Sequence, residues 1–360
     1  MPPALPASLA RLLGELTDRK PAALARSVSI VENQRAGADE LLGALHSKLG
    51  GARRIGITGP PGAGKSTLTT QLTAYYRAAG LTVGVIAVDP TSAYTGGALL
   101  GDRIRMESVA LDPGVFIRSM ATRGALGGLA SATRDVADVL DASGFDRVLI
   151  ETVGVGQSEL DVARTADTSI VVLVPESGDS IQTLKAGLME IADIFVVNKS
   201  DRPGSDRLRN EIEVMIGMRG GHTMRKVPAH HGVDLKRLAN PVRSARPAAQ
   251  ASDADSWTPP VLGTVAAKGE GTDTLASALD RHADYLVRSG ELRARRRRRL
   301  RERVVEAVER QVRLRLWNDV RTTDWLESRL PDLEGGLVSP YAAANELLRV
   351  NGDLLTGADG

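Results

Sequence analysis

The chain has 360 residues, 42% apolar and 25% charged, a balance typical of a folded globular protein with one large α/β domain and additions, or with two domains. Its formal net charge of +2 argues against electrostatic capture of nucleic acid or an anionic membrane by the whole chain. The absence of cysteine excludes disulfides, Cys-based zinc sites and a thiol nucleophile. The first residues lack a signal-peptide pattern and no apolar run reaches membrane-spanning length, so we expect a cytoplasmic protein without membrane or nucleic-acid partners.

The predicted elements begin with helices. Apolar residues recur at helical spacing from about Leu9 to Lys48, and they predict three helices, of which the second begins at Pro21 and the third ends before Gly50. From Arg53 onward, short apolar runs alternate with helical patterns. Strands are predicted at 55–58, 83–88, 115–117, 147–150, 169–174, 194–197 and 261–265, and helices at 67–79, 126–140, 159–165, 180–190, 208–216 and from 272 onward. This alternation predicts an α/β fold with a mostly parallel sheet and helices on both faces.

Two later regions differ from this pattern. Residues 203–260 contain several glycines, Pro241, Pro247 and a polar run, and they are interpreted as a short helix followed by a long excursion. After Leu286 the chain becomes helical and strongly basic, with Arg295 to Arg299 in series, and a last helix is predicted from Pro340 to Leu348. Glutamates follow the arginine run at helical spacing, so a solvated helix face is favoured over nucleic-acid binding.

A complete phosphate-binding (Walker A) sequence follows the first predicted strand of the α/β region. It reads Gly59-Pro60-Pro61-Gly62-Ala63-Gly64-Lys65-Ser66, and Thr67 follows it at the start of the predicted helix. Glycines allow backbone N–H groups to turn toward phosphate oxygens, and the helix presents its positive N-terminus to them. Lys65 is expected to bridge the β- and γ-phosphates and the Ser66 hydroxyl to bind Mg²⁺. The sequence therefore predicts a P-loop NTPase.

A second motif favours guanine over adenine. Asn198-Lys199-Ser200-Asp201 follows the predicted strand at 194–197. The carboxylate of Asp201 can accept hydrogen bonds from both N1–H and the 2-amino group of guanine, which adenine cannot supply. Asn198 is expected to hold the loop, and the stem of Lys199 to cover a face of the base. Bound GTP or GDP is therefore predicted.

Acidic residues near predicted strand ends are candidates for the metal site. Glu151 follows a strand and lies three residues before Gly154, whose N–H is expected to sense the γ-phosphate. Asp89 ends the second strand, and Asp102 follows a glycine-rich segment. Mg²⁺ prefers oxygen ligands, so these acids could surround it. The competing interpretations are a buried structural Glu151 and turn or cap roles for the aspartates.

Taken together, the segments 59–66, 88–92, 95–103, 151–159 and 198–201 resemble the MeaB/ArgK-type P-loop GTPases, and the resemblance runs from about Ala22 to the C-terminal helices. It implies a GTP-dependent chaperone of an adenosylcobalamin-dependent acyl-CoA mutase, typically methylmalonyl-CoA mutase. Such a chaperone gates cofactor delivery and protects or reactivates the mutase. The resemblance also implies a homodimer with an N-terminal helical extension (1–50), a GTPase domain (51–288) and a C-terminal helical dimerisation arm (289–360).

The resemblance assigns further residues. It implies that Asp89, Asp102 and Glu151 form the acidic cluster around the metal. It matches Val265-Ala266-Ala267 to the fifth guanine-contact loop, where Val265 replaces the usual serine, so only backbone contact is expected. It matches 177–185 to an additional switch that links partner binding to hydrolysis, with Asp179, Gln182 and Lys185 as its polar residues.

The expected reaction is in-line attack of water on the γ-phosphate. Slow intrinsic hydrolysis is expected, because no Gln or Arg is assigned to orient the water. Two alternatives remain open at this point. One is a small-molecule kinase linked to basic amino-acid transport, and the other is a nickel-type metallochaperone GTPase that would use His222, His230 and His231.

Overall fold

The computed structural model describes residues 5–89, 106–121, 128–152, 158–175, 187–219, 256–352 and 354. The predicted switch at 177–185, the glycine-rich segment at 95–103 and most of the 203–260 excursion lie outside these ranges. The chain divides into two compact units, one ending at Leu292 and the other beginning at Arg293. Each unit is described by itself below.

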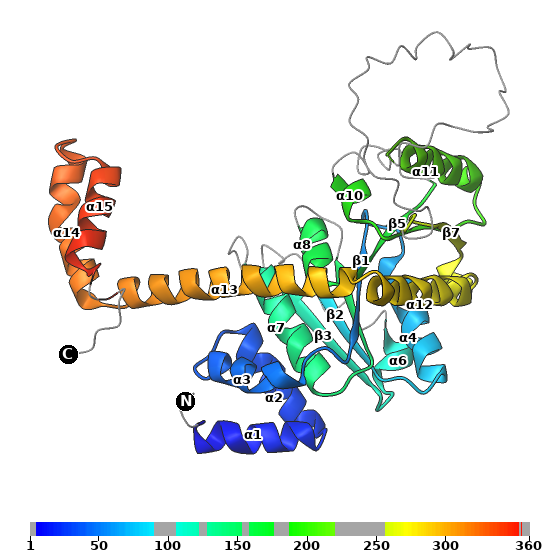
Figure 1. Ribbon diagram of the computed structural model, residues 1–360, viewed down its shortest axis with the longest axis horizontal. Helices are drawn as coiled ribbons and strands as arrows, with labels where there is room; N and C mark the ends of the chain where they lie inside the picture. Colours follow the sequence, from blue (N-terminus) through cyan, green and yellow to red (C-terminus); the bar gives the residue numbers. More distant parts are fainter. Residues whose placement is uncertain are drawn as a thin grey trace, which may run out of the picture. The chain divides into compact units, whose positions relative to one another are not determined.

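In the described part of the first unit, seven strands form one sheet in the order β3-β2-β4-β1-β5-β6-β7 (Figure 1). Every neighbouring pair is parallel. The strands are β1 (Arg53–Thr58), β2 (Val83–Asp89), β3 (Val115–Ala121), β4 (Arg147–Thr152), β5 (Thr168–Leu173), β6 (Ile194–Asn198) and β7 (Val261–Thr264). The parallel sheet predicted from the sequence is therefore confirmed, and all seven strands lie where they were expected.

Alternate strand residues pack against helices on opposite faces of the sheet. On one face, Ile55 and Ile57 share a core with Leu68 and Leu72 of α4 and with Leu275 of α12. Separate cores on the other face involve α7, α8 and α11. These helices are α4 (Lys65–Ala78), α6 (Glu107–Ala110), α7 (Gly128–Ala142), α8 (Ser158–Thr165), α10 (Met189–Ile191), α11 (Ser205–Arg219) and α12 (Thr272–Arg288), with the 3₁₀ turn η5 (Ala266–Lys268). Both faces are covered, as a parallel sheet requires.

The N-terminal helices share a core with the sheet domain. They are α1 (Ala7–Thr17), α2 (Pro21–Glu32), α3 (Ala38–Leu45) and the 3₁₀ turn η1 (His46–Lys48). Leu24 and Val28 of α2 belong to the same buried cluster as Val136 and Leu140 of α7. Figure 1 shows α2 and α3 beside α7. The three predicted helices are therefore present, and their apolar faces are buried against the neighbouring domain.

A buried polar junction fixes the chain between these helices and β1. The carboxylate of Asp141, on α7, accepts hydrogen bonds from Gly50 N at 3.0 Å and Ala52 N at 2.8 Å. The Arg54 guanidinium lies 2.8 Å from Asp141 Oδ2 and 2.7 Å from Asp138 Oδ1. Both carboxylates are buried. A buried carboxylate is stable only when it is paired and hydrogen-bonded, and Asp141 satisfies both conditions.

The second unit contains most of α13 (Glu291–Trp317), together with α14 (Val320–Glu334) and α15 (Pro340–Val350). Asp319 caps α14 by accepting a hydrogen bond from Arg321 N at 2.9 Å, and Arg329 of α14 pairs with Glu346 of α15 at 2.7 Å. The basic run predicted to be helical lies within α13. Among the described helices, none has both the length and the apolar content needed to cross a bilayer.

Candidate nucleotide-binding site

The predicted phosphate-binding loop connects the end of β1 to the start of α4. Gly59 has φ of 139°, and a Cβ atom at this position would lie 2.1 Å from the carbonyl oxygen of Val172. Gly64 has φ of 86°, and a Cβ atom there would lie 2.3 Å from Asn198 Nδ2. A side chain at either position would therefore clash in a backbone conformation that L-residues rarely adopt. The glycines allow the loop to approach β5 and the end of β6.

The positive charge of this loop is concentrated at Lys65. Its side chain is buried, and Nζ donates to the carbonyl oxygens of Gly59 at 2.8 Å and Pro60 at 2.9 Å. Lys65 is also the first residue of α4, whose first turn contains no acidic residue. The ammonium group and the helix N-terminus therefore place positive charge at the same loop, which suits a phosphate group.

Ser66 and Glu151 meet beside this loop. Ser66 Oγ donates to Glu151 Oε1 at 2.5 Å, and Glu151 is 3% exposed. The contact follows from the sheet, because β4 lies next to β1 and Glu151 is in register with Ile57. A hydroxyl and a carboxylate oxygen are ligand types that Mg²⁺ prefers, so the residues present fit this ion. A structural role for Glu151 is also compatible with its burial.

The remaining predicted metal and switch residues are described only in part. Asp89 is the last residue of β2, and Ala87, two residues earlier, is in register with Glu151, so the Asp89 backbone lies at the same edge of the sheet. The Asp89 side chain lies outside the described residues. The whole of Asp102 and Gly154 is also outside them, as are the switch residues Asp179, Gln182 and Lys185.

Asn198 joins three segments of the site. It is the last residue of β6 and is 3% exposed. Its Nδ2 donates to the carbonyl oxygen of Ala63 in the phosphate loop at 2.8 Å. Its Oδ1 accepts from Thr264 Oγ1 at 3.1 Å and from Ala266 N at 3.0 Å. One amide side chain therefore links the phosphate loop to the end of β7.

The rest of the predicted guanine motif lies on the surface next to Asn198. Lys199 has a left-handed backbone with φ of 56°. The side chain of Asp201 is 42% exposed, and its Oδ2 lies 3.4 Å from Lys268 Nζ. In the predicted fifth loop, Val265 is buried, Ala266 N donates to Asn198 and Ala267 is exposed. The apolar Val265 side chain therefore belongs to the core, in agreement with the expectation of backbone contact only.

These elements meet at the carboxyl edge of a parallel sheet, where α/β folds bind ligands. Residues 24–321 match the sequence model of a family described as methylmalonyl Co-A mutase-associated GTPase MeaB. The chain belongs to the MeaB family. A relative from Pyrococcus abyssi, whose name describes it as a GTPase, is 43% identical over 327 residues, which cover 91% of this chain and 92% of the relative.

Two further comparisons extend this MeaB-family assignment. The mouse protein named methylmalonic aciduria type A homolog, mitochondrial, is 30% identical over 365 residues, covering 94% of this chain and 78% of that protein. A crystal structure named LAO/AO transport system kinase superposes with a TM-score of 0.61 and 27% identity, covering 97% of this chain and 99% of that one. The chain is therefore a P-loop GTPase, as the two nucleotide motifs predict.

Other polar clusters of this MeaB-family member lie away from the nucleotide edge. His282 is buried, with Nδ1 2.8 Å from Thr168 Oγ1 and Nε2 3.3 Å from Asp193 Oδ1, beside the amino ends of β5 and β6. Burial raises the pKa of Tyr76 to about 12, although Arg147, 5.1 Å from its ring, acts in the opposite direction. Both clusters are enclosed in packing contacts, which suits a structural role.

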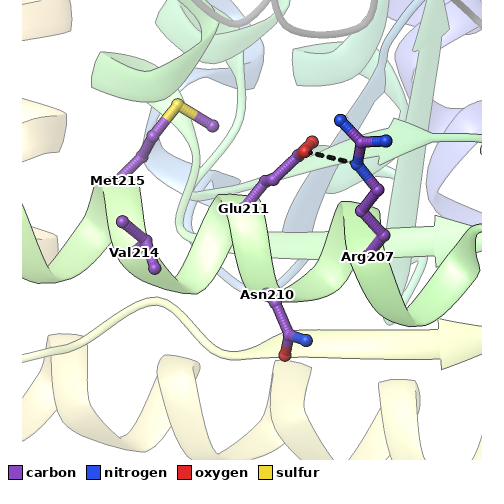
Figure 2. Close-up of a pocket in the computed structure, with 5 residues that line it drawn as sticks. All are labelled: Arg207, Asn210, Glu211, Val214 and Met215. Carbon is purple, nitrogen blue, oxygen red and sulfur yellow. Dashed lines mark hydrogen bonds and ion pairs between the residues drawn. The ribbon is translucent and has the colours of Figure 1, made fainter. Parts of the chain in front are cut away.

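A surface hollow of about 550 Å³ lies on α11 (Figure 2). Its described lining consists of Arg207, Asn210, Glu211, Val214 and Met215. Figure 2 shows Arg207 paired with Glu211 along the helix, at 2.9 Å. This pair leaves the lining without net charge, so the hollow does not resemble a phosphate site, and we assign no ligand to it.

Sequence reasoning located Asn198 and Asp201 but not the residues that contact them from β7 and η5. Thr264 and Lys268 are 66 and 67 residues away from their partners in the chain. Lys268 directly follows the predicted fifth loop, and this position in the chain was the one sequence signal that could have pointed to it as a site residue. The weak motif Val265-Ala266-Ala267 does not predict where the side chain of Lys268 points.

Proposed function

We propose that this GTPase is a Mg²⁺-dependent chaperone of an adenosylcobalamin-dependent acyl-CoA mutase of the methylmalonyl-CoA mutase type. In this proposal it gates cofactor delivery to the mutase and protects or reactivates it, in the cytoplasm. The observation that carries the proposal is the match of residues 24–321 to a family described as mutase-associated. The name of the mouse relative, which refers to methylmalonic aciduria, supports the same client.

The proposed chemistry begins with Lys65. Its two hydrogen bonds to carbonyl oxygens are bonds to neutral acceptors, whereas a phosphate oxygen is charged. The ammonium is attracted more strongly to an anionic oxygen than to a neutral carbonyl, so it should exchange the carbonyls of Gly59 and Pro60 for phosphate oxygens. Lys65 would then neutralise charge that develops on the β- and γ-phosphates during in-line attack by water.

Ser66 and Glu151 are the described residues that would hold Mg²⁺, with Asp89 and Asp102 as additional acids in the proposal. When bound, the ion supplies charge neutralisation between the β- and γ-phosphates. At present the Ser66 hydroxyl donates its proton to Glu151. If the hydroxyl oxygen held the ion, this donation would remain possible, so Glu151 would orient Ser66 and would offer a carboxylate oxygen to the same site.

The base is selected at the other end of the site. Asp201 would accept the N1–H and 2-amino hydrogens of guanine, while Asn198 holds the loop and Lys199 covers the base. An Asp201→Asn variant should lose affinity for GTP and gain it for xanthosine triphosphate, because the amide offers a donor in place of an acceptor. If the variant still preferred GTP to xanthosine triphosphate as strongly as wild type in a competition assay, this role of Asp201 would be refuted.

Regulation is assigned to the predicted switch. Asp179, Gln182 and Lys185 would respond to the client, and Gly154 would respond to the γ-phosphate. In this proposal the client completes the catalytic arrangement by ordering these segments, which is a common form of GTPase activation. The intrinsic rate should therefore be slow, and the mutase should accelerate it.

The second unit supports a homodimer. Val304 and Val308 of α13 are one helical turn apart and are 63% and 54% exposed. Leu337 and Tyr341 are 80% and 84% exposed. Several large exposed apolar side chains on one small unit are typical of a protein interface. The full-length Val304→Asp/Val308→Asp variant should sediment as a monomer if a second copy covers this helix, and Glu309→Gln, at an exposed position of the same helix, is the matched control.

The decisive experiment uses purified full-length protein and a purified adenosylcobalamin-dependent methylmalonyl-CoA mutase. GTP hydrolysis is measured with and without the mutase, and complex formation is followed by size-exclusion chromatography with GDP or a non-hydrolysable GTP analogue. Faster hydrolysis and a nucleotide-dependent complex are expected. The Lys65→Ala variant should show neither tight nucleotide binding nor hydrolysis. Absence of both a complex and a rate change with the intact protein would rule out this client.

A kinase is the second candidate, favoured by the name of the LAO/AO transport system kinase structure. Radiolabelled γ-phosphate appearing on arginine or ornithine rather than as free phosphate would support it. The nickel alternative has less support. No cluster of three or more metal-ligating side chains occurs among the described residues, and His222, His230 and His231 lie outside them. Stoichiometric nickel binding that disappears in a His230/His231 double alanine variant would revive that alternative.

A further inference from the structure

We propose that Lys268 is a positioning residue that orients the Asp201 carboxylate and thereby sets the preference of the site for guanine. The observation is the contact between Lys268 Nζ and Asp201 Oδ2 at 3.4 Å. The inference rests on the proposed recognition of guanine by Asp201. It adds a second residue, from a different part of the chain, to that recognition.

The backbone around Lys268 is held in place by a compact turn. Lys268 N donates to the carbonyl oxygen of Val265 at 2.8 Å, and Val265 N donates to that of Glu270 at 3.1 Å. Ala266 N donates to Asn198 Oδ1 at 3.0 Å, which fixes the same turn to the guanine motif. The Lys268 side chain therefore starts from a defined point beside the site.

The backbone on both sides of Asp201 is also fixed. Ser200 N donates to the carbonyl oxygen of Thr264 at 3.0 Å, and Arg202 N donates to that of Lys199 at 3.0 Å. The two charged residues consequently extend from two anchored loops. Most exposed ion pairs contribute little because both partners must give up conformational freedom, and the side chains here are 59% and 42% exposed. Anchoring of both backbones limits this cost to the torsions of the two side chains.

The chemistry of the base explains why orientation matters. Guanine offers two donors on one edge, so both carboxylate oxygens must lie in the plane of the base. The terminal torsion of aspartate is broad, and an exposed carboxylate samples many such planes. A carboxylate provides about four lone-pair sites, so a lysine on Oδ2 leaves room for the base. Lys268 therefore restricts the plane without occupying the recognition edge.

Hypoxanthine provides the discriminating probe, because it retains N1–H and lacks the 2-amino group. A base that makes one hydrogen bond to Asp201 depends less on the plane of the carboxylate than a base that makes two. Loss of Lys268 should therefore weaken guanosine nucleotides more than inosine nucleotides. The size of the effect is bounded by the value of an exposed ion pair, which corresponds to roughly a two- to fivefold change in affinity.

The experiment measures GDP and IDP binding by calorimetry with Mg²⁺, using full-length protein. Lys268→Met should lower GDP affinity roughly two- to fivefold and IDP affinity less, so that the GDP/IDP affinity ratio falls. Lys268→Arg should keep the wild-type ratio, because the positive charge remains. Glu270→Gln changes the charge of the same turn and should also keep it. Thermal unfolding of each variant without nucleotide verifies that the fold is intact.

Equal weakening of GDP and IDP in Lys268→Met would show that Lys268 only stabilises the turn, and the inference would be wrong. Unchanged or increased GDP affinity would also overturn it. Two further measurements separate this failure from failure of the proposed base site. If wild-type protein prefers GDP to ADP and Asp201→Asn abolishes that preference, the base site stands. If either result is absent, the assignment of Asp201 falls and the role of Lys268 falls with it.

Discussion

Replacement of Asn198 by alanine should destabilise the protein and weaken nucleotide binding at the same time. The amide of Asn198 donates to Ala63 O and accepts from Thr264 Oγ1 and Ala266 N, and the residue is 3% exposed. Alanine would leave all three partners without this bond in a buried region. Each buried group that loses its partner costs about 1–3 kcal/mol.

The expected loss in the free energy of unfolding lies near the lower end of the range obtained by adding the three costs. The Thr264 hydroxyl can rotate toward another acceptor, and water can enter the volume that the amide vacates, so we expect about 3 kcal/mol for the three groups together. Nucleotide affinity should fall as well, because Asn198 holds the phosphate loop at Ala63 and the β7 end at Ala266. Asn198→Asp keeps the shape and both acceptor contacts, but it turns a carboxylate oxygen toward Ala63 O, so it should destabilise the protein both by losing the Ala63 bond and by burying a charge.

Chemical denaturation without nucleotide gives the free energy of unfolding, and calorimetry with Mg²⁺-GDP gives the affinity. Asn210→Ala is the matched control, because Asn210 is exposed on α11 and its loss should change stability by less than about 0.5 kcal/mol. A loss below about 1 kcal/mol for Asn198→Ala, with wild-type affinity for GDP, would refute the role of this side chain as the link between the loops.

Three further predictions concern carboxylates. Asp141→Ala should cost about 3–5 kcal/mol in the free energy of unfolding, measured by urea denaturation, because it removes one of two carboxylate partners of the half-buried Arg54 guanidinium and the acceptor of the Gly50 and Ala52 amides. Burial would by itself raise the pKa of Asp146, but hydrogen bonds from the Thr82 backbone and side chain lower it below 3.8. The Asp146 carboxylate therefore stabilises the fold above pH 3.8, and this contribution is lost as the pH falls through its folded pKa. At pH 7 the Asp146→Asn variant should be less stable than wild type by about 1 kcal/mol, after allowance for solvent screening. Chemical denaturation below pH 3.8 should show a smaller difference. Glu151→Gln should weaken Mg²⁺-GTP binding in calorimetry while leaving metal-free GTP binding in EDTA unchanged, and equal losses in both would assign Glu151 a structural role.

The sheet and the phosphate loop were predictable because they depend on local signals. Short apolar runs mark strands buried on both faces, and a glycine-rich turn followed by Lys65 has few folded alternatives. The helical break at Asn318 and Asp319, between α13 and α14, was not predicted, because helical sequence continues on both sides of it and neither glycine nor proline marks the break. The short helix α6, of four residues, was also missed, since it spans only about one helical turn and is too short for the apolar spacing to repeat.

Long-range partners were harder to predict than elements. Apolar spacing indicated that α2 buries one face, but it could not identify α7 as the surface that covers it. The contact between Asp201 and Lys268 depends on how η5 returns beside the guanine motif, which no local pattern encodes. The roles of Asp102, Gly154 and the switch residues stay predictions, because these residues lie outside the described ranges.

The packing of the first helices onto α7 has a practical consequence for work on this protein. A shortened chain that starts at β1 would remove the N-terminal helices from the buried cluster that they share with α7, and it would remove the Gly50 amide from Asp141. Such a fragment should be prone to aggregation even with an intact nucleotide pocket. Biochemical studies of the isolated catalytic region therefore need to retain the preceding fifty residues.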